Sequence, residues 1–231
     1  VLILSLVCLV AALGGLLFGL DTAVISGALG MLRAQFRLTE WMEAGTVTSV
    51  LVGCLFGVAV AGTLSDLFGR RRVLLLSAFL FMISAVTAAI TPRTPGLFTG
   101  AFMNLCALFD VRLAPEIAGL ILARFVGGMG IGISSMVAPL YIAEISPPQV
   151  RGRLIALYQF AITVGILVTY LTNALLMHLA ETSAAEGIWQ WIFIEEVWRG
   201  MFSLGAVPAV LFLVLLLFVP ESPRWLTKQG H

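Results

Sequence analysis

One acidic residue, Asp21, lies inside a long apolar run. The run extends from Val1 to Leu32, well beyond the ~20 residues with which an α-helix crosses a hydrocarbon core. A carboxylate at that depth costs roughly 2.5 to 3.5 kcal/mol by insertion scales, so it normally faces a water-filled path or a partner charge. Asp21 is therefore the first candidate functional residue, with a proton or a substrate as its ligand. The alternative is that Asp21 only joins two helices through a buried hydrogen bond.

Arg124 is the second candidate, because it is the lone arginine at the start of a glycine-rich apolar segment, RFVGGMGIGISSMVAPLYIAEI. A cation within the membrane favours an anionic partner. Its alternative is a side chain that reaches the outer boundary of the membrane and stays solvated there.

A third group of charges lies where apolar segments end. Asp66 and Arg70 flank a glycine turn in GTLSDLFGRRRVLL, and Glu144 and Arg151 flank the two prolines of YIAEISPPQVRG. An isolated surface pair contributes only about 0 to 1 kcal/mol. Together with two charges of the PESPRWL segment, Glu221 and Arg224, these residues are expected to form a network that bridges helix ends and holds one conformation. The simpler interpretation is that the arginines only anchor the chain at the membrane surface.

The composition places these residues in a membrane. Of 231 residues, 60% are hydrophobic and 11% are charged, whereas a soluble domain carries roughly 25% charged residues. Nucleic-acid binding is not expected, because no dense basic patch is present. The three widely spaced cysteines suggest neither a disulfide framework nor a metal site. No nucleophile with a base and no phosphate-binding loop is present, so neither an enzyme nor a cofactor is expected.

The hydrophobic pattern predicts an all-α protein with six membrane spans. Between the third and fourth spans we expect an extracellular loop, 91–116, with a short helical piece. The predicted spans are 2–30, 45–67, 72–90, 117–141, 154–177 and 197–219.

Positive charge in the loops predicts the orientation, because loops rich in Lys and Arg stay in the cytoplasm. We assign the loops after the second, fourth and sixth spans to the cytoplasm, which puts both ends of the chain there, in a plasma or inner membrane. The cytoplasmic cations are Arg70, Arg71, Arg72, Arg151, Arg153, Arg224 and Lys228.

The same segments resemble a known family. The spacing of Gly62, Asp66, Gly69 and Arg70 resembles the loop between the second and third helices of the major facilitator superfamily. YIAEISPPQVRG together with PESPRWL is similar to the sugar porter family of that superfamily. The resemblance covers Gly14 to Leu226 and implies six helices built as two inverted three-helix repeats, half of a twelve-helix fold.

The resemblance also implies roles for individual residues. GGLLFGLDTAVISG is similar to the first helix of bacterial proton-coupled sugar symporters, in which the acid matching Asp21 is the proton site and the arginine matching Arg124 is its charge partner. Gln159 matches a glutamine that contacts sugar, and Phe18 matches an aromatic residue of the sugar site. An interhelical hydrogen bond and simple packing are their alternatives. Ile166 stands where xylose transporters carry a second glutamine, which favours a hexose.

From this resemblance we expect a monosaccharide importer that uses alternating access and is coupled to a proton. A facilitative sugar uniporter and a non-transporting sugar sensor on the same fold are the alternatives. Because the sequence opens without a methionine inside an apolar run, we expect a cytoplasmic tail before Val1 to be missing. Because the resemblance ends with the first half, we also expect a second six-helix half to be missing. The chain alone is then not expected to transport, since most sugar contacts in the family come from the second half.

Overall fold

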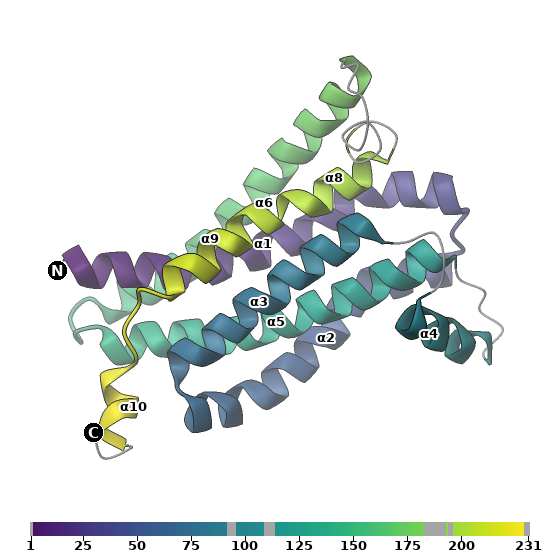
Figure 1. The fold of residues 1–231 in the computed structure, drawn as a ribbon. Coiled ribbons are helices and arrows are strands. Elements are labelled where there is room, and N and C mark those ends of the chain that lie inside the picture. Colours follow the sequence, from purple (N-terminus) through teal and green to yellow (C-terminus); the bar gives the residue numbers. More distant parts are fainter. Residues whose placement is uncertain (1, 92–95, 109–113, 183–192, 194–195, 229–231) are drawn as a thin grey trace.

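The computed structural model describes residues 2–91, 96–108, 114–182, 193 and 196–228, and this part of the chain is helical and holds no β-strand. Figure 1 shows a bundle of long helices with α10 at the end where α1 begins and α4 at the opposite end. The helices are α1 (Leu2–Phe36), α2 (Glu40–Phe68), α3 (Arg70–Ile90), α4 (Leu97–Ala107), α5 (Pro115–Ile145), α6 (Arg151–Thr182), α8 (Val197–Leu204), α9 (Ala206–Leu216) and α10 (Pro223–Lys228).

Six stretches are long and apolar enough to span a membrane: α1, α2, α3, α5, α6, and α8 with α9 taken together. The first five extend beyond the predicted spans, because a helix ends at its capping residues and not at the membrane boundary. The hydroxyl of Thr39, for example, accepts a hydrogen bond from the backbone N–H of Met42 and begins α2 at Glu40. Within the predicted loop 91–116, the structure places α4.

The last span is broken in the middle. A turn at Gly205 separates α8 from α9. Pro208 has no backbone N–H to donate to the carbonyl of Leu204, four residues earlier, so the helical ladder loses a bond there. The predicted span 197–219 therefore consists of two helices, and a turn at Leu217 follows α9.

The core is divided into two clusters along the bundle. One cluster gathers side chains such as Leu17, Phe81 and Phe212. The other gathers Val24, Phe202 and further residues from the opposite ends of the same helices. Asp21 lies on α1 between Leu17 and Val24, so the acidic residue is placed at the junction of the two clusters.

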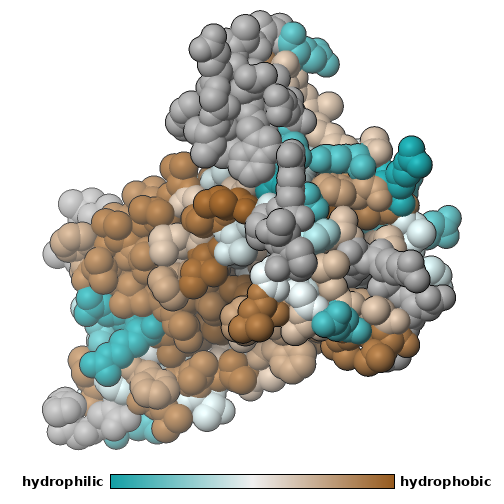
Figure 2. All heavy atoms as spheres, turned by 45° about the vertical axis from the view of Figure 1, so that its right-hand side comes forward, coloured by the Kyte–Doolittle hydropathy of each residue, from teal (hydrophilic) through white to brown (hydrophobic). Residues whose placement is uncertain are grey.

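The outside of the bundle is as apolar as its inside. Figure 2 shows hydrophobic side chains over much of the surface seen in this view. Leu55, Phe56, Phe160 and Leu171 are among the large apolar side chains that are more than half exposed. Such a surface is unfavourable in water and favourable against lipid, as expected of helices that span a membrane.

Glycines set the closest helix contacts. A Cβ added at any of four glycines would overlap a backbone carbonyl oxygen of the facing helix, so α2 and α5 pack backbone against backbone. The four glycines are Gly53 and Gly57 of α2 and Gly128 and Gly132 of α5. Gly19 of α1 and Gly165 of α6 form a second seam of the same kind.

Gly128→Ala is therefore expected to lower the free energy of unfolding by about 1 to 3 kcal/mol, because overpacking at a backbone contact forces the two helices apart. Denaturant unfolding of the detergent-solubilised chain would measure the change. Gly30→Ala is the matched control, since a Cβ on Gly30 of α1 meets no atom within 4 Å. Equal stability of the two variants would contradict the close seam between α2 and α5.

Candidate functional site

The structure brings Asp21 of α1 and Arg124 of α5 together in the interior of the bundle. The shortest distance between an Arg124 nitrogen, Nη2, and an Asp21 oxygen, Oδ2, is 3.9 Å. The side chain of Asp21 is 15% exposed and that of Arg124 is 1% exposed. The two residues thus form a loose ion pair that is almost completely removed from solvent.

Arg124 has other partners that hold it in place. Its Nε donates a hydrogen bond to the backbone oxygen of Thr46 on α2, at 3.2 Å. Its guanidinium lies over the ring of Phe202 on α8, 5.5 Å from the ring centroid, within the range of a cation–π interaction. Arg124 therefore connects α2, α5 and α8, whichever state Asp21 adopts.

The ion pair leaves one hydrogen-bonding atom of each side chain without a partner. Asp21 Oδ2 and Arg124 Nη1 are buried and have no hydrogen-bond partner among the described residues. A buried polar atom without a partner costs about 1 to 3 kcal/mol, more when it is charged. Such a pair is ready to change, because protonation, hydration or a small helix shift would each relieve the cost.

Gly127 of α5 makes room for this pair. A Cβ at Gly127 would lie 2.5 Å from the hydroxyl oxygen of Ser84 on α3 and 3.7 Å from Asp21 Oδ1. Both oxygens therefore surround one small space beside the helix. The short side chain of Ser84 is a member of the site that the sequence interpretation missed, since a serine within an apolar helix carries no signal of its own.

The three candidate sugar residues lie beside the seam of α1 and α6. Gln159 is exposed, whereas Phe18 and Ile166 are partly buried. Gln159 and Ile166 are seven residues apart on α6, so they share one face of that helix. Gly19, next to Phe18, packs against the backbone of Ile162 and Ile166. The structure thus places the three predicted residues on adjoining helices near one seam.

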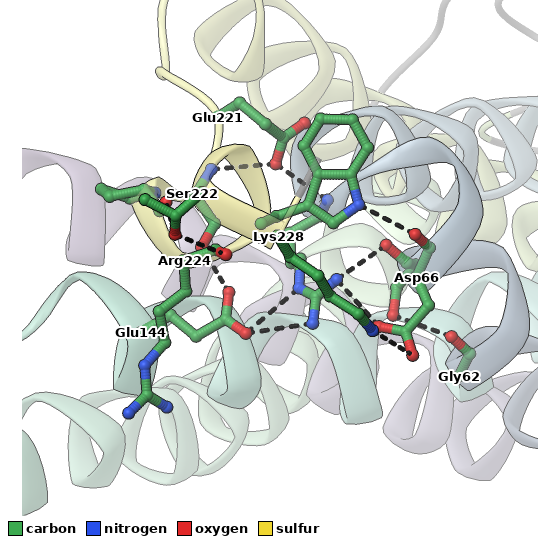
Figure 3. A network of polar contacts seen from close by, with 12 residues as sticks. Gly62, Asp66, Glu144, Glu221, Ser222, Arg224 and Lys228 are labelled. Carbon is green, nitrogen blue, oxygen red and sulfur yellow. Dashed lines mark hydrogen bonds and ion pairs between the residues drawn. The ribbon is translucent and has the colours of Figure 1, made fainter. Parts of the chain in front are cut away.

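The second group of predicted residues meets at the end of the bundle where α10 lies (Figure 3). Arg70, at the start of α3, is its centre. Its Nη2 lies 3.0 Å from Glu144 Oε1 of α5, and its Nη1 lies 3.0 Å from Asp66 Oδ1 of α2. The side chains of Arg70 and Glu144 are 9% and 6% exposed, whereas Asp66 is half exposed. The well-buried Arg70–Glu144 pair is therefore the part that matters most for stability.

Glu221 caps a helix instead of pairing with a side chain. One of its oxygens, Oε1, accepts hydrogen bonds from the backbone N–H groups of Arg70 and Arg71, at 2.8 and 3.0 Å. A carboxylate at the N-terminus of α3 interacts favourably with the helix dipole. In return, the Arg71 side chain donates to the carbonyl oxygens of Leu216 and Leu217 at the end of α9. The turn at Gly69, with φ of 92°, allows this approach.

Arg151 and Arg224 lie outside this cluster, in contrast to the expected network. Glu144 already has both oxygens occupied, by Arg70 and by the hydroxyl of Ser222. The Arg151 guanidinium instead donates to the carbonyl oxygen of Ser146, at 3.3 Å. Arg224 is exposed, and its side chain makes no recorded polar contact with the described residues. The expected network therefore forms without the side chains of Arg151 and Arg224 among the described contacts.

Three residues of α10 and its approach enter the cluster without having been predicted. Ser222 donates to Glu144, Trp225 donates its indole N–H to the carbonyl oxygen of Asp66 at 2.9 Å, and Lys228 lies 3.7 Å from Asp66 Oδ2. Ser222 and Trp225 are uncharged, so counting charges could not find them. Trp225 and Lys228 tie α10 to the end of α2, and Ser222 ties the approach to α10 to α5.

A further buried pair at the opposite end was also missed. Glu196 and Arg199 form an ion pair next to α8, and Arg199 donates to the carbonyl oxygens of Ala89 and Thr91 at the end of α3. Gln35 of α1 bridges Glu196 and the indole of Trp198. These contacts fasten α1, α3 and α8 together.

Among the described residues, no three His, Cys, Asp or Glu side chains gather as metal ligands.

Comparison with known proteins identifies similar chains. A family model described as "Sugar (and other) transporter" matches residues 7–231. The arabinose-proton symporter of Bacillus subtilis is 40% identical over 97% of this chain, which covers 42% of that protein. The D-xylose-proton symporter of Escherichia coli K12 is also 40% identical, over 97% of this chain and 45% of that protein. This chain thus spans less than half the length of these relatives.

Solved structures agree in fold. The proton:xylose symporter XylE bound to 6-bromo-6-deoxy-D-glucose, of the major facilitator superfamily, superposes with a TM-score of 0.79 at 38% identity. The match covers 97% of this chain and 46% of that one. A partially occluded inward open form of XylE from E. coli matches with a TM-score of 0.76.

Proposed function

This chain belongs to the sugar transporter family of the major facilitator superfamily, and from that premise we propose that it forms the proton-binding part of a proton-coupled monosaccharide importer. The observation that carries the proposal is the loose, buried pair of Asp21 and Arg124. An ionisable pair inside a membrane bundle with an unsatisfied carboxylate oxygen is the arrangement that a proton carrier requires.

The pair gives a physical route from a proton to a conformational change. When Asp21 is charged, it attracts Arg124 and holds α1 beside α5. When Asp21 takes a proton, this attraction is lost, and Arg124 keeps only Thr46 and Phe202 as partners. Protonation therefore shifts the balance of contacts among α1, α2, α5 and α8, which favours a different packing of the bundle.

The charged cluster at the other end supplies the second element of the proposal. Arg70, Glu144, Glu221 and Ser222 join α3, α5 and the approach to α10. We assign this end to the cytoplasm from the positive charge of its loops. In alternating access, such a cluster holds the cytoplasmic side closed. It opens when the binding of substrate and proton offsets the free energy needed to break its contacts. The membrane is taken to be the plasma or inner membrane of the cell.

A monosaccharide is the proposed substrate class. The relatives include proteins that are named as carriers of arabinose, xylose and glucose. In this chain, Gln159 offers an amide that can donate and accept hydrogen bonds to neighbouring hydroxyl groups, and Phe18 offers an apolar surface for a sugar ring. Ile166 in place of a second amide favours a hexose.

The proposal is tested by transport in reconstituted vesicles. We would fuse this chain to the C-terminal six helices of the E. coli D-xylose-proton symporter, called here the fused protein, and compare it with the chain alone. The expected result is that the fused protein accumulates labelled sugar under an imposed proton gradient, whereas the chain alone does not. Uptake that ignores the gradient would show a facilitative uniporter. Sugar binding without any uptake would favour a sensor.

Ile166→Gln is expected to strengthen xylose binding relative to glucose in the fused protein. One added hydrogen bond contributes about 1 kcal/mol, which corresponds to roughly a fivefold change in affinity. Competition of unlabelled sugars with labelled uptake would measure the ratio. Leu167→Gln is the matched control, because residue 167 is exposed on another face of α6. An unchanged ratio in Ile166→Gln would remove residue 166 from the specificity site.

A further inference from the structure

A cavity of about 320 Å³ lies beside Asp21 and is lined by α1, α3, α6, α8 and α9. We call it the vestibule and define it by the residues that give it character: Asp21, Ser84, Ala85, Thr169, Gly205 and Pro208. Its remaining walls are apolar. Asp21 is the one charged residue among those that line it.

The break in the last span creates this space. On one side of the break, Phe212 of α9 packs against Gly14 of α1. On the other side, Phe202 of α8 belongs to the cluster that includes Val24 of α1. Between them, at Gly205 and Pro208, the chain turns and leaves the middle of α1 uncovered. The vestibule is therefore the gap between the two core clusters, at the level of Asp21.

We expect the polar atoms that line the vestibule to bind water. Two polar residues of its lining are Ser84 and Asp21, and Asp21 Oδ2 is buried without a hydrogen-bond partner among the described residues. A buried water normally makes two to four hydrogen bonds to such groups. Ser84 Oγ and Asp21 Oδ1 both lie near Gly127 of α5, and a water that bridges these two oxygens is part of the inference.

Gln159 and part of the vestibule lining lie on opposite faces of α6. Val168 and Thr172 of α6 line it. Nine residues separate Val168 from Gln159, which at 3.6 residues per turn is half a turn around the helix. Gln159 therefore points away from Val168, whereas Ile166 lies one turn before Thr169, which lines the vestibule. Of the elements packed on α1, α5 contributes the charged group that faces Asp21, Arg124, while the vestibule residues of α3, α6, α8 and α9 are uncharged.

We propose that the vestibule holds the water from which Asp21 takes its proton, with Ser84 as the positioning residue. In this step a hydrated proton transfers to the Asp21 carboxylate, leaving a neutral water molecule and a neutral carboxyl group. The inference rests on the proposed proton-binding role of Asp21. It adds the source of the proton and names the residues that surround it.

The test is infrared spectroscopy of the 231-residue chain in lipid nanodiscs. The protonated Asp21 carboxyl gives a C=O band, identified as the band that Asp21→Asn removes. On transfer to D₂O, a hydrated carboxyl exchanges its proton and its band shifts. Ala85→Leu places a larger side chain in the vestibule beside Gly205, and we expect it to slow this exchange by about tenfold or more. Thr87→Leu, exposed on the same helix, should exchange like the wild type.

Ser84→Ala tests the positioning residue by a second readout, and it keeps the proposal testable if Ala85→Leu fails to fold. Removing the hydroxyl should raise the C=O frequency of Asp21, because a hydrogen-bonded partner is lost. Ser77→Ala is the matched control, since the Ser77 hydroxyl is also buried on α3 but donates to its own helix at Leu74.

Two results would overturn the proposal. A wild-type band that does not exchange would show a dry vestibule filled by a lipid tail, and equal exchange in Ala85→Leu and wild type would show that water reaches Asp21 elsewhere. The proposed function fails separately, if sugar uptake by the fused protein ignores the proton gradient. The spectroscopic result does not depend on uptake.

Discussion

Asp21→Asn in the fused protein is expected to abolish the accumulation of sugar against its gradient while leaving equilibration across the membrane intact. Asparagine has nearly the same shape as a protonated aspartic acid but cannot release a proton. The bundle would therefore stay in the state that the protonated acid favours, and Arg124 would keep only its contacts to Thr46 and Phe202. Sugar could still cross, but the proton gradient would no longer drive it.

Accumulation and exchange are measured separately in vesicles. Labelled sugar uptake under an imposed proton gradient reports accumulation, and exchange of labelled for unlabelled sugar without a gradient reports translocation. Glu181→Gln is the control, because it also removes one carboxylate charge but lies exposed at the far end of α6. It should keep both activities.

Each contrary outcome has a specific meaning. If Asp21→Asn accumulates sugar as the wild type does, Asp21 only joins α1 to α5 and the proton site lies elsewhere. If both proteins equilibrate sugar without responding to the gradient, the protein is a uniporter. If the variant loses exchange as well as accumulation, the pair with Arg124 is required for the structure, and folding of the variant must then account for the loss.

The depth of Asp21 could be predicted from sequence, because one carboxylate within a long apolar run is costly enough to stand out. Its partner was harder to identify. Arg124 is about a hundred residues away, and the pairing followed from the resemblance and not from spacing. The surroundings could not be predicted at all: Ser84 and Gly127 are ordinary residues of membrane helices, and only their packing places them beside the carboxylate.

In the charged cluster, the sequence indicated most of the charged residues but not their partners. Its members were selected by charge, and charge alone cannot tell which oxygen meets which nitrogen. Glu144 binds Arg70 and Ser222, whereas Arg151 donates to the carbonyl oxygen of Ser146. Glu221 uses its charge on backbone N–H groups, which no pattern of charged side chains reveals. Helix-end geometry, set by the glycine turn at Gly69, decides these partners.

Arg70→Ala is expected to be the most destabilising substitution in the charged cluster at the α10 end of the bundle. Removing the arginine leaves Glu144, 6% exposed, without its cation and with Ser222 as its remaining recorded partner. Breaking one side of a buried ion pair typically costs about 3 to 5 kcal/mol, because the other charge stays buried. The exposed Asp66, in contrast, should contribute little to the loss, since a half-exposed pair is screened by solvent.

Denaturant unfolding of the chain in detergent micelles would measure this loss, with Arg72→Ala as the control. Arg72 lies two residues after Arg70 on α3 and is exposed. Its substitution should change the free energy of unfolding by no more than about 0.5 kcal/mol. Adding Glu144→Gln to Arg70→Ala should restore part of the stability, because the neutral amide no longer carries an unpaired charge. If Glu144→Gln gives no recovery, the loss comes from the contact of Arg70 with the carbonyl oxygen of Ser65, at 2.9 Å, and the Arg70–Glu144 pair is not what holds this end of the bundle together.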